Sequence, residues 1–235
     1  MKGFSRKIAV VFYGPPGAGK GTQADLLAKA LNLAPFDIGS YLEAVVHDPQ
    51  NRRDKFIQRQ RQIFDGGKIC DPAWVAKISG GRIRTIAKAG LGMVLSGALR
   101  TVLETFGKRT GGLIHILEQV YGRKNIFFFL LEVKSSTSLA RNRIRLICSV
   151  CGRPVLTKYV KFRPTSCPLC GGALHRRTLD DPKVIRVRLQ AFREETAPVF
   201  EKLRRRGYQI RVINGELAPY IVHKNIIKKL RQWLR

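Results

Sequence analysis

The sequence has few acidic residues and no long apolar run. Its 235 residues include 16 Asp and Glu against 44 Lys and Arg, which gives a formal net charge of +28. Such an excess predicts anionic partners such as nucleotides, RNA or acidic surfaces, and a generally basic, solvated surface explains it equally well. No stretch approaches the roughly 18 uninterrupted apolar residues of a transmembrane helix, so we expect no membrane partner.

A secretion signal, an internal repeat and a low-complexity tract are also lacking. The basic and then apolar start is similar to a signal peptide, but its apolar run is short and ends in a glycine-rich turn rather than in a small-residue cleavage site. We therefore expect a cytoplasmic protein, and we interpret residues 6–13 as a strand. Hydrophobic residues make up 44% of the chain, which is enough for a packed core.

Short apolar runs alternate with helix-length segments along the chain. Buried parallel strands form continuous apolar runs, as IFFFLLEV does at residues 126–133. The alternation predicts an α/β fold with a parallel sheet. We expect strands at residues 6–13, 92–95, 126–133 and 208–213, and helices at 20–31, 102–121, 184–205 and, with a basic outer face, 221–235.

Two stretches interrupt this alternation. Residues 40–79 are polar and helical, and we expect an excursion from the sheet there. Residues 141–179 carry four cysteines, nine Lys or Arg and no acidic residue. This composition predicts a separate insert held together by a metal.

The cysteines of the second stretch have metal-site spacing. Cys148-x2-Cys151 and Cys167-x2-Cys170 are separated by 15 residues, which fits a zinc pattern. Four thiolates in a closed tetrahedron favour one structural zinc per chain over a catalytic one. An iron centre or disulfides are the alternatives. Cys70 lies outside this set, and we expect it to be a small apolar residue.

A glycine-rich loop follows the first expected strand. Gly14-Pro-Pro-Gly-Ala-Gly19-Lys20 matches GxxxxGK, with a strand pattern before it and a helix pattern after it. Such a loop turns backbone N–H groups toward phosphate oxygens, while its lysine reaches the β- and γ-phosphates. The N-terminus of the following helix adds positive potential. The motif predicts a nucleoside triphosphate site, although Gly21 displaces the usual Ser or Thr to Thr22.

Together, GPPGAGKGTQA, the paired CxxC motifs and RVRLQAFREETAP resemble the adenylate kinase family in its zinc-lid form, over nearly the whole chain. The resemblance implies a P-loop NTPase fold with five parallel strands flanked by helices. It implies a core of residues 1–39, 80–140 and 182–235, an insert at 40–79 that binds a nucleoside monophosphate (NMP), and a zinc lid at 141–181. It also implies a monomeric phosphotransferase that moves a phosphoryl group reversibly from ATP·Mg to an NMP, AMP being the first candidate.

The resemblance also implies roles for single residues. Phosphoryl transfer is mainly positioning and charge neutralisation, for which arginine forks are suited. Arg141 would stack on the ATP adenine, and Arg145, four residues later on the same helical face, would contact the phosphates. The catalytic set would be Lys20, Arg100, Arg145, Arg177 and Arg188. ATP would be bound by Gly17, Ala18, Gly19, Lys20, Gly21, Thr22, Arg141, Arg145 and Leu217, and the NMP by Ile38, Gly39, Glu43, Lys68, Ile69, Cys70, Gly97, Arg100, Glu104, Arg177 and Arg188.

The sequence departs from the family pattern at the acceptor and magnesium sites. Ser40 and Ser96 stand where the family has aspartates near magnesium, although Asp37 is close by in the sequence. Glu43 stands where an arginine would bind the monophosphate, and Arg52 or Arg53 is a candidate to compensate. These changes are compatible with slow catalysis, with a different arrangement around magnesium that includes Asp37, or with loss of turnover.

Glu104 replaces the glutamine that reads the acceptor adenine in the family. A carboxylate only accepts hydrogen bonds, and guanine offers two adjacent donors to it. We therefore hypothesise that the preference for AMP is weakened and that GMP or another monophosphate competes. The alternative is that the side chain of residue 104 points elsewhere.

The sequence is also compatible with a second function. In it, a degenerate kinase fold binds nucleotide, and its basic lid and tail bind RNA. Tyr159 and Phe162 lie among the lid charges, as in a protein that stacks single-stranded bases. A basic lid over phosphates is, however, expected of a kinase as well.

Overall fold

The centre of the protein is a parallel sheet. The computed structural model describes residues 7–107, 111–155 and 164–234. The five strands run in the order β2-β3-β1-β4-β8, and neighbouring strands are parallel. This confirms the predicted α/β fold. The strands are β1 (Ala9–Tyr13), β2 (Ala34–Asp37), β3 (Met93–Ser96), β4 (Ile126–Glu132) and β8 (Ile210–Asn214).

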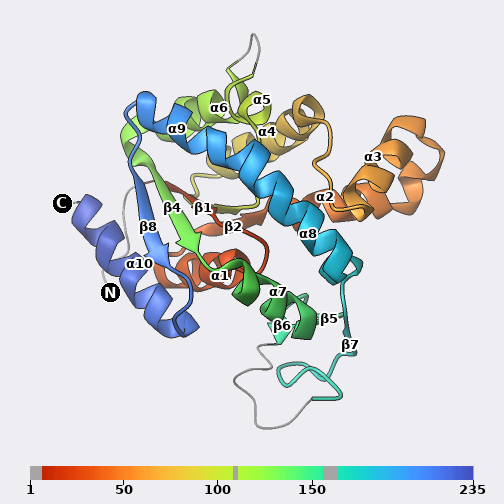
Figure 1. The fold of residues 1–235 in the computed structure, drawn as a ribbon. Helices are drawn as coiled ribbons and strands as arrows, with labels where there is room; N and C mark the ends of the chain where they lie inside the picture. Colours follow the sequence, from red (N-terminus) through yellow and green to blue (C-terminus); the bar gives the residue numbers. More distant parts are fainter. Residues whose placement is uncertain (1–6, 108–110, 156–163, 235) are drawn as a thin grey trace.

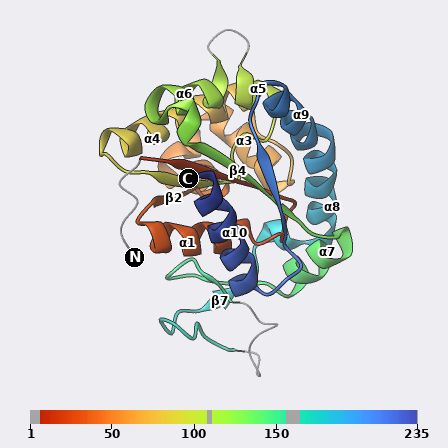
Figure 2. The same cartoon turned by 90° about the vertical axis from the view of Figure 1, so that its left-hand side faces the viewer.

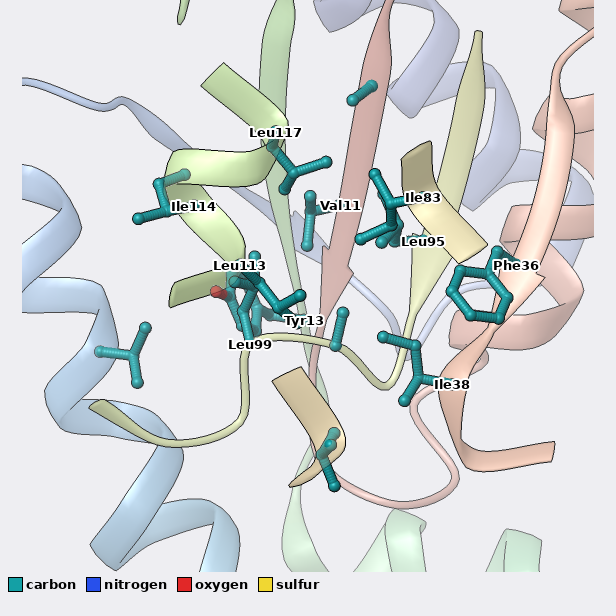
Figure 3. Packing of buried hydrophobic residues seen from close by; sticks show 14 of the residues in the cluster. Val11, Tyr13, Phe36, Ile38, Ile83, Leu95, Leu99, Leu113, Ile114 and Leu117 are labelled. Carbon is teal, nitrogen blue, oxygen red and sulfur yellow. The ribbon is translucent and has the colours of Figure 1, made fainter. Parts of the chain in front are cut away.

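Helices cover both faces of the sheet (Figures 1 and 2). Side chains alternate along β1, so Val10 and Phe12 pack toward α1 (Lys20–Leu31) and α10 (Pro219–Trp233). Val11 and Tyr13 point to the other face, where the larger cluster of buried side chains lies (Figure 3). That face is covered by α4 (Pro72–Lys88), α5 (Val102–Phe106), α6 (Gly112–Tyr121) and α9 (Ala197–Arg205).

The expected single helix over residues 102–121 is wrong. The segment forms two helices, α5 and α6, because the chain turns at Gly107 (φ 65°) and at Gly111 (φ 79°). Gly112 then lies so close to α5 that a Cβ there would be 2.4 Å from the Thr105 carbonyl oxygen. Only glycine tolerates both the positive φ and this close approach.

The helix expected over residues 184–205 is present as one continuous rod. It consists of α8 (Pro182–Ala191), a π-helical segment (Phe192–Thr196) and α9. It begins two residues earlier than expected because the Asp181 side chain accepts a hydrogen bond from the Lys183 amide (2.8 Å). Pro182 at the first helical position suits such a start.

Residues 38–71 form a helical excursion that extends away from the sheet (Figure 1). It contains α2 (Ile38–His47), a 3-10 helix (Pro49–Arg53) and α3 (Lys55–Asp65), which Asp54 caps through the amides of Phe56 and Ile57. The excursion begins directly at the end of β2, and α4 runs through residue 79, where we expected the insert to end.

The cysteine-bearing insert is a small antiparallel sheet beyond α7 and α8 (Figure 1). Its strands run in the order β6-β5-β7. The chain enters it from β4 through α7 (Ser135–Ile144) and leaves through a 3-10 helix (Thr178–Asp180). The strands are β5 (Leu146–Cys148), β6 (Pro154–Val155) and β7 (Leu174–His175), and a short 3-10 helix (Arg123–Asn125) precedes β4. Over the described part of the chain, no helix has the length and apolar character needed to span a membrane.

Candidate active site

The glycine-rich loop connects β1 to α1 as predicted. Gly17 (φ 75°) and Gly19 (φ 92°) have left-handed backbone conformations. A Cβ at Gly17 would lie 2.5 Å from Nδ2 of Asn142, so α7 packs directly against the loop. The Ser138 hydroxyl, also on α7, donates to the Pro16 carbonyl (2.5 Å). Gly19 provides no side-chain cap to α1, so the first amides of this helix are available to an anion.

A cleft of about 1010 Å³ opens above this loop. It is lined by the loop, by residues after β2 and β3, and by side chains of α2, α7, α8 and the lid. In parallel α/β sheets, ligands bind beyond the carboxyl ends of the strands, where this cleft lies. All nine expected ATP-binding residues line it, and so do seven expected NMP-binding residues, namely Gly39, Glu43, Lys68, Gly97, Arg100, Arg177 and Arg188.

The other four residues expected to bind the monophosphate do not line the cleft. Ile38 and Cys70 are core side chains, 0% and 3% exposed, which agrees with the expectation that Cys70 is a small apolar residue. Ile69 and Glu104 are also absent from the cleft wall.

Lys20 is half-buried in the wall of the cleft. Its ammonium group donates to the carbonyls of Gly14 (2.7 Å) and Pro15 (2.9 Å). Burial, together with the charges of Arg188 and Arg100, lowers the pKa of Lys20 to about 7, although Asp37 opposes this. A group whose charge is so disfavoured gains when an anion arrives beside it.

Arginine side chains converge on the same space from several elements. Burial, together with the nearby charges of Arg100, Arg177 and Arg145, lowers the pKa of Arg188 to about 9, although Asp180 opposes this. The Arg188 guanidinium donates to the Leu179 carbonyl (3.3 Å). So many cations so close together are costly unless a polyanion neutralises them.

Two of these arginines form ion pairs with carboxylates. Nε of Arg145 donates to Asp180 (2.8 Å) in a two-pronged ion pair. Arg177 pairs with Glu43, so a lid residue contacts α2 across the cleft. Arg145 does not share a helical face with Arg141, because α7 ends at Ile144 and Arg145 has an extended backbone.

Arg141 is held by backbone oxygens. It donates to the Gly215 carbonyl (2.9 Å) and more weakly to those of Glu216 (3.3 Å) and Gly17 (3.4 Å). These contacts join the phosphate loop to the segment after β8. Leu217 in that segment also lines the cleft, as expected.

Asp37 and Ser96 form a pair at the ends of two neighbouring strands. The Ser96 hydroxyl donates to the Asp37 carboxylate (2.5 Å), and the other carboxylate oxygen accepts from the Ser40 amide (2.7 Å). Asp37 lines the cleft and acts electrostatically on Lys20. The cleft therefore has one carboxylate, that of Asp37, beside Ser40 and Ser96, the two positions at which the family pattern has aspartates.

Glu104 points away from the cleft and into the protein. It is 1% exposed, and its two oxygens accept from the amides of Leu99 (2.7 Å) and Arg100 (3.0 Å). Burial raises its pKa to about 6, although these amides and the Arg100 charge favour the ionised form. This is the alternative considered above, in which residue 104 does not face the base.

Other residues differ from expectation as well. Arg52 and Arg53 are exposed and do not line the cleft, so neither replaces the arginine lost at Glu43. Asn142 and Asp25, which the sequence did not single out, are both in the cleft wall. Asn142 donates to the Ser138 carbonyl one turn earlier (2.7 Å), and burial raises the pKa of Asp25. The only sequence signal of Asn142 is a polar residue on the buried face of a helix, and Asp25, which is exposed on α1, has no such signal.

The four lid cysteines form one cluster. Their sulfur atoms all lie within 4.8 Å of one another, with 3.5 Å from Cys148 to Cys170 and 3.8 Å from Cys151 to Cys167. Thiolates around one tetrahedral zinc are about 3.8 Å apart, since each Zn–S bond is about 2.3 Å. All four cysteines are free thiols, which removes disulfides as the explanation. Tyr159 and Phe162 lie outside the described residues.

Comparisons with known proteins agree with this geometry. A family model described as an AAA domain matches residues 13–142. The adenylate kinase of Geobacter sulfurreducens is 32% identical over 197 residues, covering 81% of this chain and 83% of that protein. That of Pelobacter propionicus is 29% identical over 224 residues, covering 94% and 96%. With its phosphate loop, parallel sheet and a four-cysteine lid consistent with the zinc-lid type, the chain belongs to the adenylate kinase family.

Proposed function

We propose that the protein is a nucleoside monophosphate kinase that moves the γ-phosphoryl group of ATP·Mg reversibly to AMP, and that it accepts GMP or another monophosphate less readily. One observation carries the proposal: Lys20 and four arginines from separate elements line a single cleft above the phosphate loop. A protein that only holds ATP has no need of the arginines on the acceptor side. AMP is the first acceptor because the relatives are adenylate kinases.

The transfer needs few chemical groups from the protein. An oxygen of the acceptor monophosphate attacks the γ-phosphorus of ATP, and the bond from that phosphorus to the β–γ bridging oxygen breaks. ADP leaves, and the acceptor becomes a diphosphate. Lys20 and the loop amides neutralise the donor phosphates, and Arg100 binds the acceptor phosphate. Arg145, Arg177 and Arg188 surround the phosphoryl group during its transfer.

The residues present fit magnesium through one carboxylate. Asp37 lies in the cleft with its carboxylate oriented by Ser40 and Ser96, and Thr22 is the nearest hydroxyl in the loop motif. Magnesium bound with ATP supplies charge neutralisation at the β- and γ-phosphates. Asp37 would hold it through water molecules.

The lid cysteines fit zinc, as one structural ion per chain. Cluster geometry supports this, because all positions around the metal are taken by sulfur and none is open for a substrate. The ion would order the small antiparallel lid, which has little apolar core of its own. Closing of this lid over ATP would exclude water from the transfer.

Turnover measurements test the proposal. The zinc-loaded protein is incubated with ATP·Mg and with AMP, GMP, CMP, UMP or dTMP, and the nucleoside diphosphates formed are quantified. We expect turnover with AMP near an ordinary enzyme rate of about 10 per second. If the protein binds ATP but turns over no monophosphate, the substitutions at Ser40, Glu43 and Ser96 accompany a loss of catalytic activity, and the proposal is wrong.

A further inference from the structure

The loop between β3 and α5 has an unusual backbone. Leu99 has a positive φ of 55°, one of only two such non-glycine residues in the described part of the chain. Its side chain is 0% exposed and belongs to the same buried cluster as Leu113 and Tyr13 (Figure 3). A branched side chain disfavours this conformation, which persists only where the surroundings impose it. Arg100 is the next residue, so its direction depends on this turn.

Glu104 is the group that holds the turn. One carboxylate oxygen accepts from the Leu99 amide (2.7 Å) and the other from the Arg100 amide (3.0 Å). The Glu104 amide in turn donates to the Thr101 hydroxyl (3.0 Å). In an ordinary capping box the glutamate would reach back to the cap residue, Thr101. Here the Thr101 amide also favours the ionised carboxylate, and the two oxygens reach further back, to the amides of Leu99 and Arg100.

The position of Arg100 makes this matter for function. Its side chain lines the cleft and acts electrostatically on both Lys20 and Arg188. Among the described residues, no carboxylate forms an ion pair with Arg100. The Leu99–Arg100 backbone therefore sets the point from which this guanidinium enters the cleft, and the charge of Glu104 also attracts it.

We propose that Glu104 is a positioning residue that fixes the Leu99–Arg100 turn and so aims Arg100 at the phosphate of the acceptor monophosphate, whatever base that monophosphate carries. This inference rests on the proposed kinase function. This positioning role takes the place of the base-reading role considered for Glu104 from the sequence. A side chain that binds two backbone amides and does not line the cleft cannot select between adenine and guanine.

Glutamine at position 104 is a close structural mimic with different hydrogen bonding. It has one acceptor oxygen, and its NH2 group would face a backbone N–H. One buried amide would be left without an acceptor, which is costly. The turn would relax, and a small displacement of Arg100 is enough to weaken phosphate binding substantially.

Binding titrations test the proposal separately from turnover. Dissociation constants for AMP, GMP, UMP and ATP are measured for the wild type, Glu104→Gln, Arg100→Ala and the double variant. Glu104→Gln should weaken all three monophosphates by a similar factor, on the order of tenfold, and leave ATP within about twofold. In the Arg100→Ala background the same substitution should change monophosphate affinity by less than about twofold, because coupled residues are non-additive.

A matched control removes a carboxylate elsewhere. Glu118 on α6 lies outside the cleft wall and accepts a hydrogen bond from the Tyr208 hydroxyl (2.6 Å). Glu118→Gln should leave the affinities for AMP, GMP, UMP and ATP unchanged. A loss confined to purines, or an altered AMP-to-GMP ratio, would overturn the proposal in favour of base reading. Equal weakening of ATP, or additive effects with Arg100→Ala, would overturn it in favour of general destabilisation. A wild type that binds ATP but no monophosphate would overturn the proposed function itself.

Discussion

Lys20 is the residue whose charge should respond most to the donor nucleotide. Its pKa in the ligand-free fold is about 7, against an ordinary value of 10.5. A bound triphosphate restores the favourable environment for the cation, so binding above neutral pH should take up a proton. Calorimetric titration of ATP in buffers of different ionisation enthalpy measures this uptake. Lys20→Arg keeps the charge but does not titrate, so equal uptake in the variant would contradict the assignment.

The same depressed pKa affects the stability of the ligand-free protein. Between about pH 7 and pH 10.5 the unfolded chain binds more protons at Lys20 than the folded chain does. The free energy of unfolding should therefore rise with pH across this window. Denaturant titrations of wild type and Lys20→Met across the window check the sign, since the slope should be smaller in the variant.

Exchanging the residues at positions 37 and 96 tests whether Asp37 holds magnesium. If Asp37 holds magnesium through water, Asp37→Asn should reduce the gain in ATP affinity that magnesium provides. Because the two side chains bond to each other, Asp37→Ser combined with Ser96→Asp should restore much of that gain. ATP titrations with and without magnesium give the readout, and Mn2+ bound with ATP gives an independent spectroscopic one. A double variant no better than Asp37→Asn would count against a shared site.

At the scale of elements, the lid should depend on its metal. Elemental analysis should find one zinc per chain. Its removal by a chelator should raise hydrogen exchange in β5, β6 and β7 and leave the parallel sheet protected, because metal binding to such sites contributes on the order of 10–16 kcal/mol in peptides. Cys167→Ser should lose the zinc, whereas Cys70→Ala, a core change outside the cluster, should keep it. Retention of zinc by the Cys167 variant would contradict the four-sulfur site.

The Glu43–Arg177 pair links α2 to the lid, and it should compete with substrate. Arg177 is only 17% exposed and has Glu43 as its partner, so a phosphate must displace that carboxylate. Glu43→Gln should therefore tighten monophosphate binding several-fold, while costing less than about 1 kcal/mol of folding stability, as expected of a partly exposed ion pair. AMP titrations and thermal unfolding give the two quantities. Weaker AMP binding in the variant would instead mean that Glu43 contacts the substrate favourably.

At the scale of the whole molecule, the charge of +28 should produce salt-sensitive RNA binding. The affinity for a single strand falls by about 0.7 log unit per log unit of salt for each phosphate contacted. We expect single-stranded RNA to bind at low salt and to be lost by roughly 200 mM salt. Affinity that survives such salt, and that ATP does not displace, would establish a second function. Fluorescence anisotropy with a labelled oligonucleotide, with and without ATP, distinguishes these results.

The sequence was most informative where local chemistry determines structure. The glycine loop, the cysteine spacing and the apolar run at residues 126–133 each predicted their element because each carries its own physical constraint. The break between α5 and α6 was missed, since it depends on how closely Gly112 approaches Thr105. The Asp37–Ser96 pair was missed for a similar reason, because it joins the ends of two strands that are distant in sequence and meet only in the folded sheet. The direction of Glu104 was left open between two alternatives, because it depends on the positive-φ turn at Leu99, which the sequence pattern does not predict.

The lid begins and ends at almost the same point of the molecule. Arg145, just before β5, pairs with Asp180, just before α8. The segments that enter and leave the lid are therefore joined by an ion pair at its base. The entropy cost of closing such a loop grows only slowly with its length. The lid is thus an exchangeable module: evolution or an engineer could shorten, lengthen or replace it while the sheet and its phosphate loop stay as they are.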